Sequence, residues 1–434
     1  MTYVLGIDLG ACSTGAAILR PGSGEDPAPL GLGVHTPRAA SALFLAADGR
    51  VLAGDAAESR GWECPERLAR GFKARVGDSV PLAVGEALVP AEELYAALAR
   101  WVVTTVEARE GAPAAAVALT HPRGWGGYRV SVARRALAEA GLAHALLLSE
   151  PEAAALHHAA GTPLDPGAMV AVCNLGGSVE ATVLRRGAGT DRGAADFETL
   201  GRSGGPARDL GAELDEAVFA HVLDALGGPA GEPDTGDPRV ASALAQVRRE
   251  CATAKEALAG GAEATVKVVL PGARKQVRIT PEEFEALAGN LLRGAADILG
   301  QALRSARVSV RDLAAVILTG GTAAIPLAAR ILAEEAPGAV AADADPASVT
   351  ARGAALAAAG HLKAGVGTEA VVASVLRVHG TAVRPHPDDL GLLLPAPPTV
   401  EAGGVLYIPV PRTRQRIAAG TGMTAASGAS RPGA

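Results

Sequence analysis

Residues 6–10 (GIDLG) carry an apolar strand into a glycine turn, with the carboxylate of Asp8 at the strand's end. A near-copy, residues 170–177 (VAVCNLGG), lies in the second half of the chain. Each is followed by a second apolar run, at 15–19 and at 181–184, so each segment predicts a β-hairpin whose tip lacks bulky side chains. Glycine lets backbone N–H groups approach phosphate oxygens closely. The pair of hairpins therefore predicts two facing lobes that grip an anionic group, with Asp8 holding a hard cation through water.

The composition narrows the class of protein. A chain of 434 residues predicts two or three domains, and 49% hydrophobic with 3% aromatic residues is typical of a soluble α/β protein. The net charge of −6 without a basic block argues against nucleic acid as a partner. Neither a leader sequence nor an apolar run of membrane-spanning length is recognised. The four cysteines form no CxxC pair, which favours a reduced, cytoplasmic protein without a structural metal.

Strand and helix patterns alternate along both halves. In the first half, helices are predicted at 90–107 and 127–140, with buried strands at 115–120 and 146–148. In the second, a capping box at Thr280–Glu283 starts a helix to about 306, and a strand at 314–318 ends in Thr319-Gly320-Gly321. Two more helices are expected from Pro326 and Pro346, and the Gly/Ser/Ala-rich segment 418–434 is expected to be disordered.

The ordered set of motifs resembles the nucleotide-binding region of DnaK-type heat-shock protein 70 chaperones, within the actin-like ATPase superfamily. The matching segments, in chain order, are the Asp8 hairpin, 72–77, 119–122, 149–155, 209–215, 251–258, 318–326 and 353–355. The resemblance implies an α/β, actin-like ATPase fold of two lobes, each with a mixed sheet and flanking helices, around a central nucleotide cleft. The implied domains are lobe I at 1–165 (upper subdomain about 37–110), lobe II at 166–361 (upper subdomain about 206–280), a C-terminal extension at 362–417 and the tail.

The resemblance also implies site residues, with ATP or ADP and Mg²⁺ as cofactors. Lys73, Glu150 and Asn174 take the catalytic positions, and Asp8 would hold the Mg²⁺ water shell. The nucleotide contacts would come from Asp8, Gly10, Ala11, Cys12, Gly176, Gly177, Ser178, Lys255, Gly320 and Gly321. Of the 40 Lys and Arg residues only five are Lys, and two of these, Lys73 and Lys255, match functional lysines of the family.

Several positions depart from the family's pattern. Ala11 and Cys12 stand where the family has hydroxyl residues, and a thiol is a weak donor to phosphate. Asn174 replaces an Asp, so a carboxylate is lost. Around the expected adenine position the family's charged and hydroxyl residues are replaced by Ala252, Glu256, Ala259 and Ala324. Weak ATP binding and slow hydrolysis follow from these changes.

The sequence therefore predicts an ATP-binding, chaperone-like protein with slow or impaired hydrolysis and with a protein partner or client. The family's peptide-binding domain is expected to be lacking, because only about 70 residues follow Gly360. Two alternatives remain open. One is a pseudo-ATPase interaction or scaffold module, and the other is an actin-like filament protein.

Overall fold

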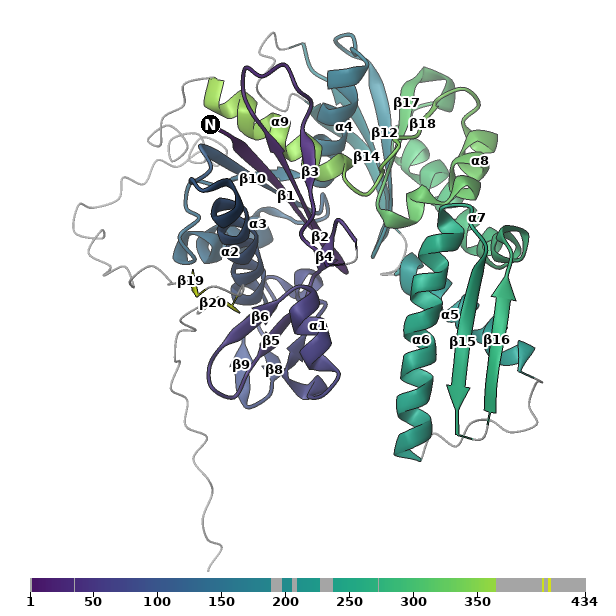
Figure 1. Cartoon of the computed structure of the whole chain (residues 1–434). Coiled ribbons are helices and arrows are strands. Elements are labelled where there is room, and N and C mark those ends of the chain that lie inside the picture. Colours follow the sequence, from purple (N-terminus) through teal and green to yellow (C-terminus); the bar gives the residue numbers. More distant parts are fainter. Residues whose placement is uncertain are drawn as a thin grey trace, which may run out of the picture.

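Two mixed β-sheets with their helices organise the chain into two bodies, which lie side by side in Figure 1 and are called lobe I and lobe II here. The computed structural model describes residues 2–34, 36–188, 197–204, 209–226, 237–271, 273–363, 400–401 and 405–406. Most of the expected C-terminal extension and all of the expected tail lie outside the described residues.

The sheet of lobe I begins with the hairpin predicted around Asp8. Strand β1 (Val4–Leu9) is buried along its whole length, pairs antiparallel with β2 (Ser13–Leu19) and pairs parallel with β10 (Ala116–His121). A strand buried on both faces reads as a continuous apolar run, and VLGIDL does so up to its single carboxylate. The other strands are β11 (Leu146–Ser149) beside β10, and β3 (Ala28–Leu30) and β4 (Ala39–Ala40) beside β2.

A smaller part of lobe I follows in sequence and lies below this sheet in Figure 1. Helices α2 (Ala91–Glu110) and α3 (Gly127–Glu139) lie beside the sheet, where α2 contacts β1. The smaller part contains α1 (Asp55–Gly61) and the short 3₁₀ helix at Phe72–Arg75, which carries Lys73. Its strands are β5 (Leu43–Leu45), β6 (Val51–Ala53), β7 (Leu68–Ala69), β8 (Leu82–Val84) and β9 (Ala87–Val89), with β19 (Val400–Glu401) and β20 (Val405–Leu406) added at the β6 edge.

Lobe II repeats the arrangement. Its sheet has the order β14 (Phe197–Gly204), β13 (Val179–Arg186), β12 (Met169–Leu175), β17 (Leu313–Thr319) and β18 (Val340–Ala341). Its helices are α5 (Leu210–Ala225), α6 (Pro238–Ala259), α7 (Pro281–Ala306) and α8 (Pro326–Glu335), and a hairpin of β15 (Ala264–Leu270) and β16 (Ala273–Ile279) lies against α6. The capping box predicted at Thr280 is present, with both of its hydrogen bonds formed to Glu283.

Two helices join the lobes, α4 (Glu150–Gly161) and α9 (Val349–Lys363), which cross near the top of Figure 1. Helix α9 follows the lobe II sheet in sequence but packs on β1, β2 and β10 of lobe I. Two glycines permit this approach. A Cβ at Gly353 would lie 1.7 Å from the carbonyl oxygen of Ala153 in α4, and a Cβ at Gly6 would lie 2.2 Å from backbone atoms of Ala351 and Ala355. Pro346 lies in the turn that precedes α9, so this helix begins three residues later than its sequence indicated.

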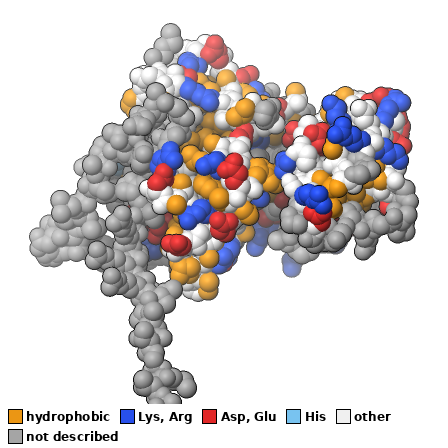
Figure 2. Space-filling model, turned by 60° about the horizontal axis from the view of Figure 1, so that its bottom comes forward, with side chains coloured by type: hydrophobic (Ala, Val, Ile, Leu, Met, Phe, Trp, Pro, Cys, Tyr) orange, Lys and Arg blue, Asp and Glu red, His pale blue; other side chains and the backbone are white. Residues whose placement is uncertain are grey.

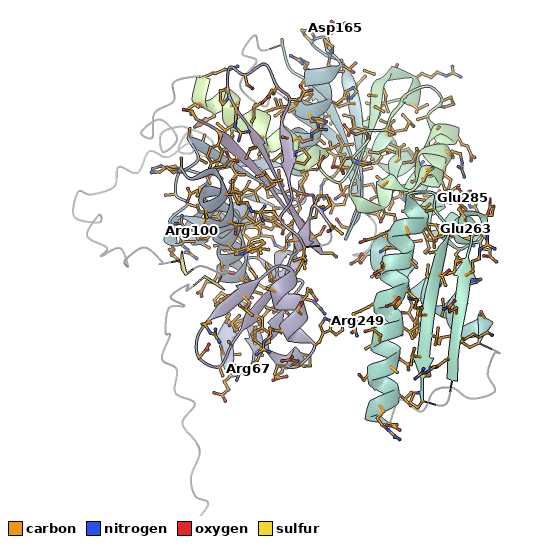
Figure 3. The ribbon with its side chains drawn as sticks, viewed as in Figure 1. Arg67, Arg100, Asp165, Arg249, Glu263 and Glu285 are labelled. Carbon is orange, nitrogen blue, oxygen red and sulfur yellow. The ribbon has the colours of Figure 1, made fainter. Side chains whose placement is uncertain are left out.

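The lobes meet again at the end opposite α4 and α9. The guanidinium of Arg249, on α6, lies 4.3 Å from the ring centroid of Trp62, which follows α1. Figure 3 shows Arg249 pointing from α6 toward lobe I. Because Trp62 is half exposed, this cation–π contact lies at the surface.

Acidic and basic side chains are intermixed over the face drawn in Figure 2, with small hydrophobic areas between them. Among the described residues, no helix combines the length and apolar character needed to cross a bilayer.

Candidate nucleotide-binding site

The first glycine hairpin places Asp8 at the rim of the lobe I sheet. Asp8 lies opposite Gly15 in the β1–β2 pair, and the hydroxyl of Thr120 on β10 donates to its Oδ1 at 3.0 Å. The hydroxyl of Ser41 donates to the carbonyl oxygen of Gly10 at 2.8 Å and so supports the turn from behind. The loop of residues 10–12, predicted to contact phosphate, is thus held by hydrogen bonds from neighbouring segments.

Arg38 is a residue of this site that the sequence did not indicate. Its Nη2 donates to Oδ2 of Asp8 at 2.9 Å and to the carbonyl oxygen of Ser13 at 2.7 Å. Its Nε donates to the Ser13 hydroxyl at 2.8 Å, and its Nη1 donates to the carbonyl oxygen of Ala347, just before α9, at 2.6 Å. The side chain is 17% exposed. Arg38 therefore fixes a buried positive charge against the first hairpin.

The second hairpin places Asn174 and Glu180 directly opposite each other on β12 and β13. Side chains of directly opposed residues share one face of a sheet, so the two project together. Gly320, which follows β17, lies against this hairpin: with φ +93°, its Cβ would be 2.6 Å from the carbonyl oxygen of Leu175 and 2.8 Å from Oδ1 of Asn174. Only glycine permits that approach, so the third predicted loop packs on the second.

The tips of the two hairpins meet between the lobes. A Cβ at Gly177 would lie 2.8 Å from Cβ of Ala11 and 2.9 Å from Sγ of Cys12. The thiol of Cys12 also donates to Oδ2 of Asp209, the N-cap residue of α5 in lobe II, at 2.7 Å. Cys12 is exposed, but desolvation by the atoms around its thiol, and then the hydrogen bond to Asp209, raise its pKa to about 12, so the group remains a neutral thiol at physiological pH. The two predicted phosphate loops are therefore in contact with each other.

Lys73 and Glu150, predicted from different segments, form a buried ion pair with 2.5 Å between Nζ and Oε1. Glu180 of lobe II lies within electrostatic reach of both. Burial first, and then the charge of Glu150, raise the pKa of Glu180, while Lys73 lowers it. His121 lies beside the same pair, and burial lowers its pKa, which favours a neutral imidazole. The two lobes thus bring one ammonium and two carboxyl groups together beside the hairpin tips.

Lys255 takes part in a separate contact. Its Nζ lies 2.7 Å from Oδ1 of Asp215 and donates to the carbonyl oxygen of Gly211 at 3.2 Å. These contacts tie α6 to the start of α5. Since Lys255 still lowers the pKa of Cys12, its charge reaches the hairpin tips.

Three residues that the sequence analysis missed, Arg38, Glu180 and Asp209, therefore belong to the site. Glu180 could have been found, because the partner of Asn174 across a two-stranded ladder follows from the length of the hairpin. No sequence pattern around Arg38 or Asp209 indicated that either residue belongs to the site. Both reach the site through side-chain contacts with residues distant in sequence.

The Mg²⁺ site implied by the resemblance can be tested against these contacts. Mg²⁺ keeps most of its water and is held through one or two carboxylates together with phosphate oxygens. Here Asp8 is paired with Arg38, Asn174 is neutral, and Asp209 accepts from Cys12. Among the described residues, no three His, Cys, Asp or Glu side chains gather as a metal-binding group. The residues present do not fit a protein-anchored Mg²⁺.

Two lobes, two facing glycine hairpins and a buried lysine–glutamate pair between them define a two-lobed α/β class of protein. Comparison with known proteins agrees. The family model described as "Hsp70 protein" matches residues 69–375, more than half of the chain. The chain therefore belongs to the Hsp70 family, which confirms both the resemblance seen in its motifs and the actin-like ATPase fold.

Individual relatives are distant. The chain is 24% identical to a "Chaperone protein DnaK" of Cenarchaeum symbiosum, over 75% of this chain and 49% of that protein. It is 30% identical to a "Chaperone protein HscA homolog" of Azotobacter vinelandii, over 81% of this chain and 56% of that protein. It is also 30% identical to "Heat shock 70 kDa protein BIP3" of Oryza sativa, over 56% of this chain and 36% of that protein. The chain spans about half the length of the curated relatives it matches.

Proposed function

We propose that this chain binds ATP or ADP between its lobes and acts as a chaperone-like protein with slow or impaired hydrolysis. The observation that carries the proposal is the convergence of the hairpin tips at residues 10–12 and 176–178 beside the Lys73–Glu150 pair. Glycine tips present backbone N–H groups to phosphate, and Lys73 supplies a fixed cation beside them. Gly320, which packs on the second hairpin, and Gly321 after it are proposed to lie under the nucleoside.

Hydrolysis needs an oriented water and stabilisation of the charge that develops on the transferred phosphoryl group. In the proposal Lys73 stabilises that charge, while Glu150 and Glu180 orient the water. Asn174 can accept a hydrogen bond from the water but offers no negative charge, and the raised pKa of Glu180 favours its protonated form relative to an ordinary glutamate. Both features weaken the polarisation of the water, which supports slow turnover.

Nucleotide-dependent melting tests the binding step. At a ligand concentration 100-fold above Kd, binding stabilises the folded protein by about 2.7 kcal/mol. ATP, ADP and GTP should each be tested with and without Mg²⁺, because the base-contacting positions are altered. An unchanged melting temperature with every nucleotide would refute the proposal.

Phosphate release tests the chemical step. Lys73→Ala should abolish turnover, whereas Lys267→Ala, at an exposed position on β15, should leave it unchanged. Asn174→Asp adds a carboxylate without changing size and should raise turnover, each factor of ten corresponding to about 1.4 kcal/mol of barrier. Brisk turnover by the unmodified chain that Asn174→Asp slows would contradict the assigned role of Asn174.

A second function is favoured by the contacts of the hairpins themselves. Ala11 and Cys12 touch Gly177, and Cys12 is hydrogen-bonded to Asp209, so the lobes already hold each other at the point where phosphate would enter. In this alternative the chain is a pseudo-ATPase interaction module whose lobe geometry is set by these contacts. Absence of both nucleotide-dependent melting and phosphate release would support it.

The proposal extends to partners and location. The described residues up to Lys363 form the two lobes, and we propose that these lobes themselves offer no site for an extended apolar peptide. A labelled apolar heptapeptide should therefore show no saturable binding in fluorescence anisotropy, and micromolar affinity would refute this part. Free cysteines at 12, 64, 173 and 251 support a reducing, cytoplasmic environment.

A further inference from the structure

Asp8 has two partners that leave it little capacity for a metal. Its Oδ1 accepts from Thr120 and its Oδ2 accepts from the guanidinium of Arg38. The ion pair with Arg38 is 2.9 Å long and both side chains are largely buried, at 17% and 12% exposure. A divalent cation beside Asp8 would therefore lie next to a guanidinium in a region of low dielectric, where like charges repel strongly.

Arg38 does not depend on Asp8 for its position. Three further acceptors hold its guanidinium: the hydroxyl and carbonyl oxygens of Ser13, and the carbonyl oxygen of Ala347. Together with the bond to Asp8, these contacts use four of the five donors that a guanidinium carries. Its Nη2 and Nη1 also lie 3.2 Å and 2.5 Å from where Cβ atoms at Gly10 and Gly15 would stand, so glycine at both positions makes room for it. The positive charge is built into the first hairpin.

The second hairpin offers no replacement for Asp8. Asn174 carries no charge, and its Oδ1 lies against Gly320 and Gly176 rather than free between the lobes. Burial and the charge of Glu150 raise the pKa of Glu180, which lies opposite Asn174, while the nearby charges of Lys73 and Arg202 lower it. No uncompensated carboxylate faces the first hairpin among these residues.

From these contacts we propose that the site binds nucleotide without Mg²⁺, with the fixed guanidinium of Arg38 supplying at Asp8 the positive charge that a hydrated metal would otherwise supply. The inference rests on the proposed nucleotide binding and adds the form in which the nucleotide is bound. Because the guanidinium of Arg38 is a fixed positive charge, the phosphates need no metal ion to neutralise them at this point. The guanidinium attracts the more negative, metal-free nucleotide at least as well as the Mg²⁺ complex.

Calorimetric titration of the unmodified chain with ADP, in EDTA and in excess Mg²⁺, tests the proposal. We expect the two Kd values to agree within about threefold, which is less than ~0.7 kcal/mol. Binding that requires Mg²⁺ would overturn the inference while leaving the proposed function intact. Absence of binding in both buffers would overturn the proposed function and the inference with it.

Substitution of Arg38 gives a second test. Arg38→Gln removes the charge and frees Asp8, so ADP should bind about tenfold or more weakly in EDTA, and Mg²⁺ should restore most of the loss. Arg20→Gln is the matched control, because Arg20 pairs with Glu110 on the outer side of lobe I and should leave both Kd values unchanged. Equal loss of affinity in both buffers for Arg38→Gln would contradict the assigned role.

Mn²⁺ provides a readout that does not depend on the variant folding. Free Mn²⁺ is followed by electron paramagnetic resonance while the unmodified chain, saturated with ADP, is added. We expect Mn²⁺ to bind no more tightly than it binds ADP alone in buffer. Tightening of Mn²⁺ binding by about tenfold or more would show a protein-anchored metal and would refute the proposal.

Discussion

Replacing Gly353 by alanine tests the contact on which the two-lobe arrangement depends. Gly353 lies in α9 where this helix crosses α4, and both helices connect the lobes. A Cβ there would stand 1.7 Å from the carbonyl oxygen of Ala153 and 2.4 Å from its carbonyl carbon. Both are backbone atoms of a packed helix, so the clash cannot be relieved by a side-chain rotation and the helices must separate by more than an ångström.

The size of the effect follows from two opposing terms. Overpacking of a buried contact costs about 1–3 kcal/mol and occasionally more. Alanine gains about 1 kcal/mol over glycine from helix propensity. Because the obstacle is backbone, the cost should lie at the upper end, and we expect a net loss of about 2 kcal/mol, seen as a melting temperature lower by several degrees.

The control is Gly294→Ala in α7, where a Cβ would have nothing within 4 Å. That variant retains only the propensity gain and should melt at a higher temperature than the unmodified chain. Differential scanning calorimetry of the three proteins decides. If Gly353→Ala were stabilised as much as Gly294→Ala, the close crossing of α4 and α9 would be refuted.

Three further outcomes follow from the contacts between the lobes. Arg249→Ala should remove a surface cation–π contact worth about 0.5–1 kcal/mol and increase the quenching of Trp62 fluorescence by acrylamide. Arg248→Ala is the control, because Arg248 lies on the same helix but over Phe219, and it should not affect Trp62. Equal quenching in all three proteins would exclude the contact. The raised pKa of Cys12 means that its thiolate is scarce up to about pH 9, so alkylation by iodoacetamide should be slow there and accelerate only as the pH rises toward about 12. Asp209→Asn should lower the pKa of Cys12 and speed its alkylation at pH 9. No change in the rate would argue against the hydrogen bond. Because the folded-state pKa of Cys12 exceeds its unfolded value, its contribution to stability is complete below about pH 8.5 and is lost as the pH rises toward 12, so urea midpoints of the unmodified chain should fall more steeply over that range than those of Cys12→Ser.

The sequence by itself determined much of this protein. The glycine hairpins, the capping box at Thr280 and the helical patterns of α2 and α7 are local features, in which neighbouring residues alone favour one backbone conformation. The ordered motifs identified the family, and Lys73 and Glu150 were assigned to one site before their contact was known. The domain boundaries and the roles of individual site residues stay predictions.

The tertiary structure decided which partners each side chain of the candidate site contacts. The pairing of Arg38 with Asp8 joins residues that are separated by thirty positions, with β2 and β3 between them, so no local pattern could reveal it. The hydrogen bond between Cys12 and Asp209 depends on how the two lobes close. The interaction between two charges depends on their distance in space and not on their separation in the sequence. The electrostatics of this site therefore follow only from the fold, which brings β1, β13, α5 and the segment at Arg38 together.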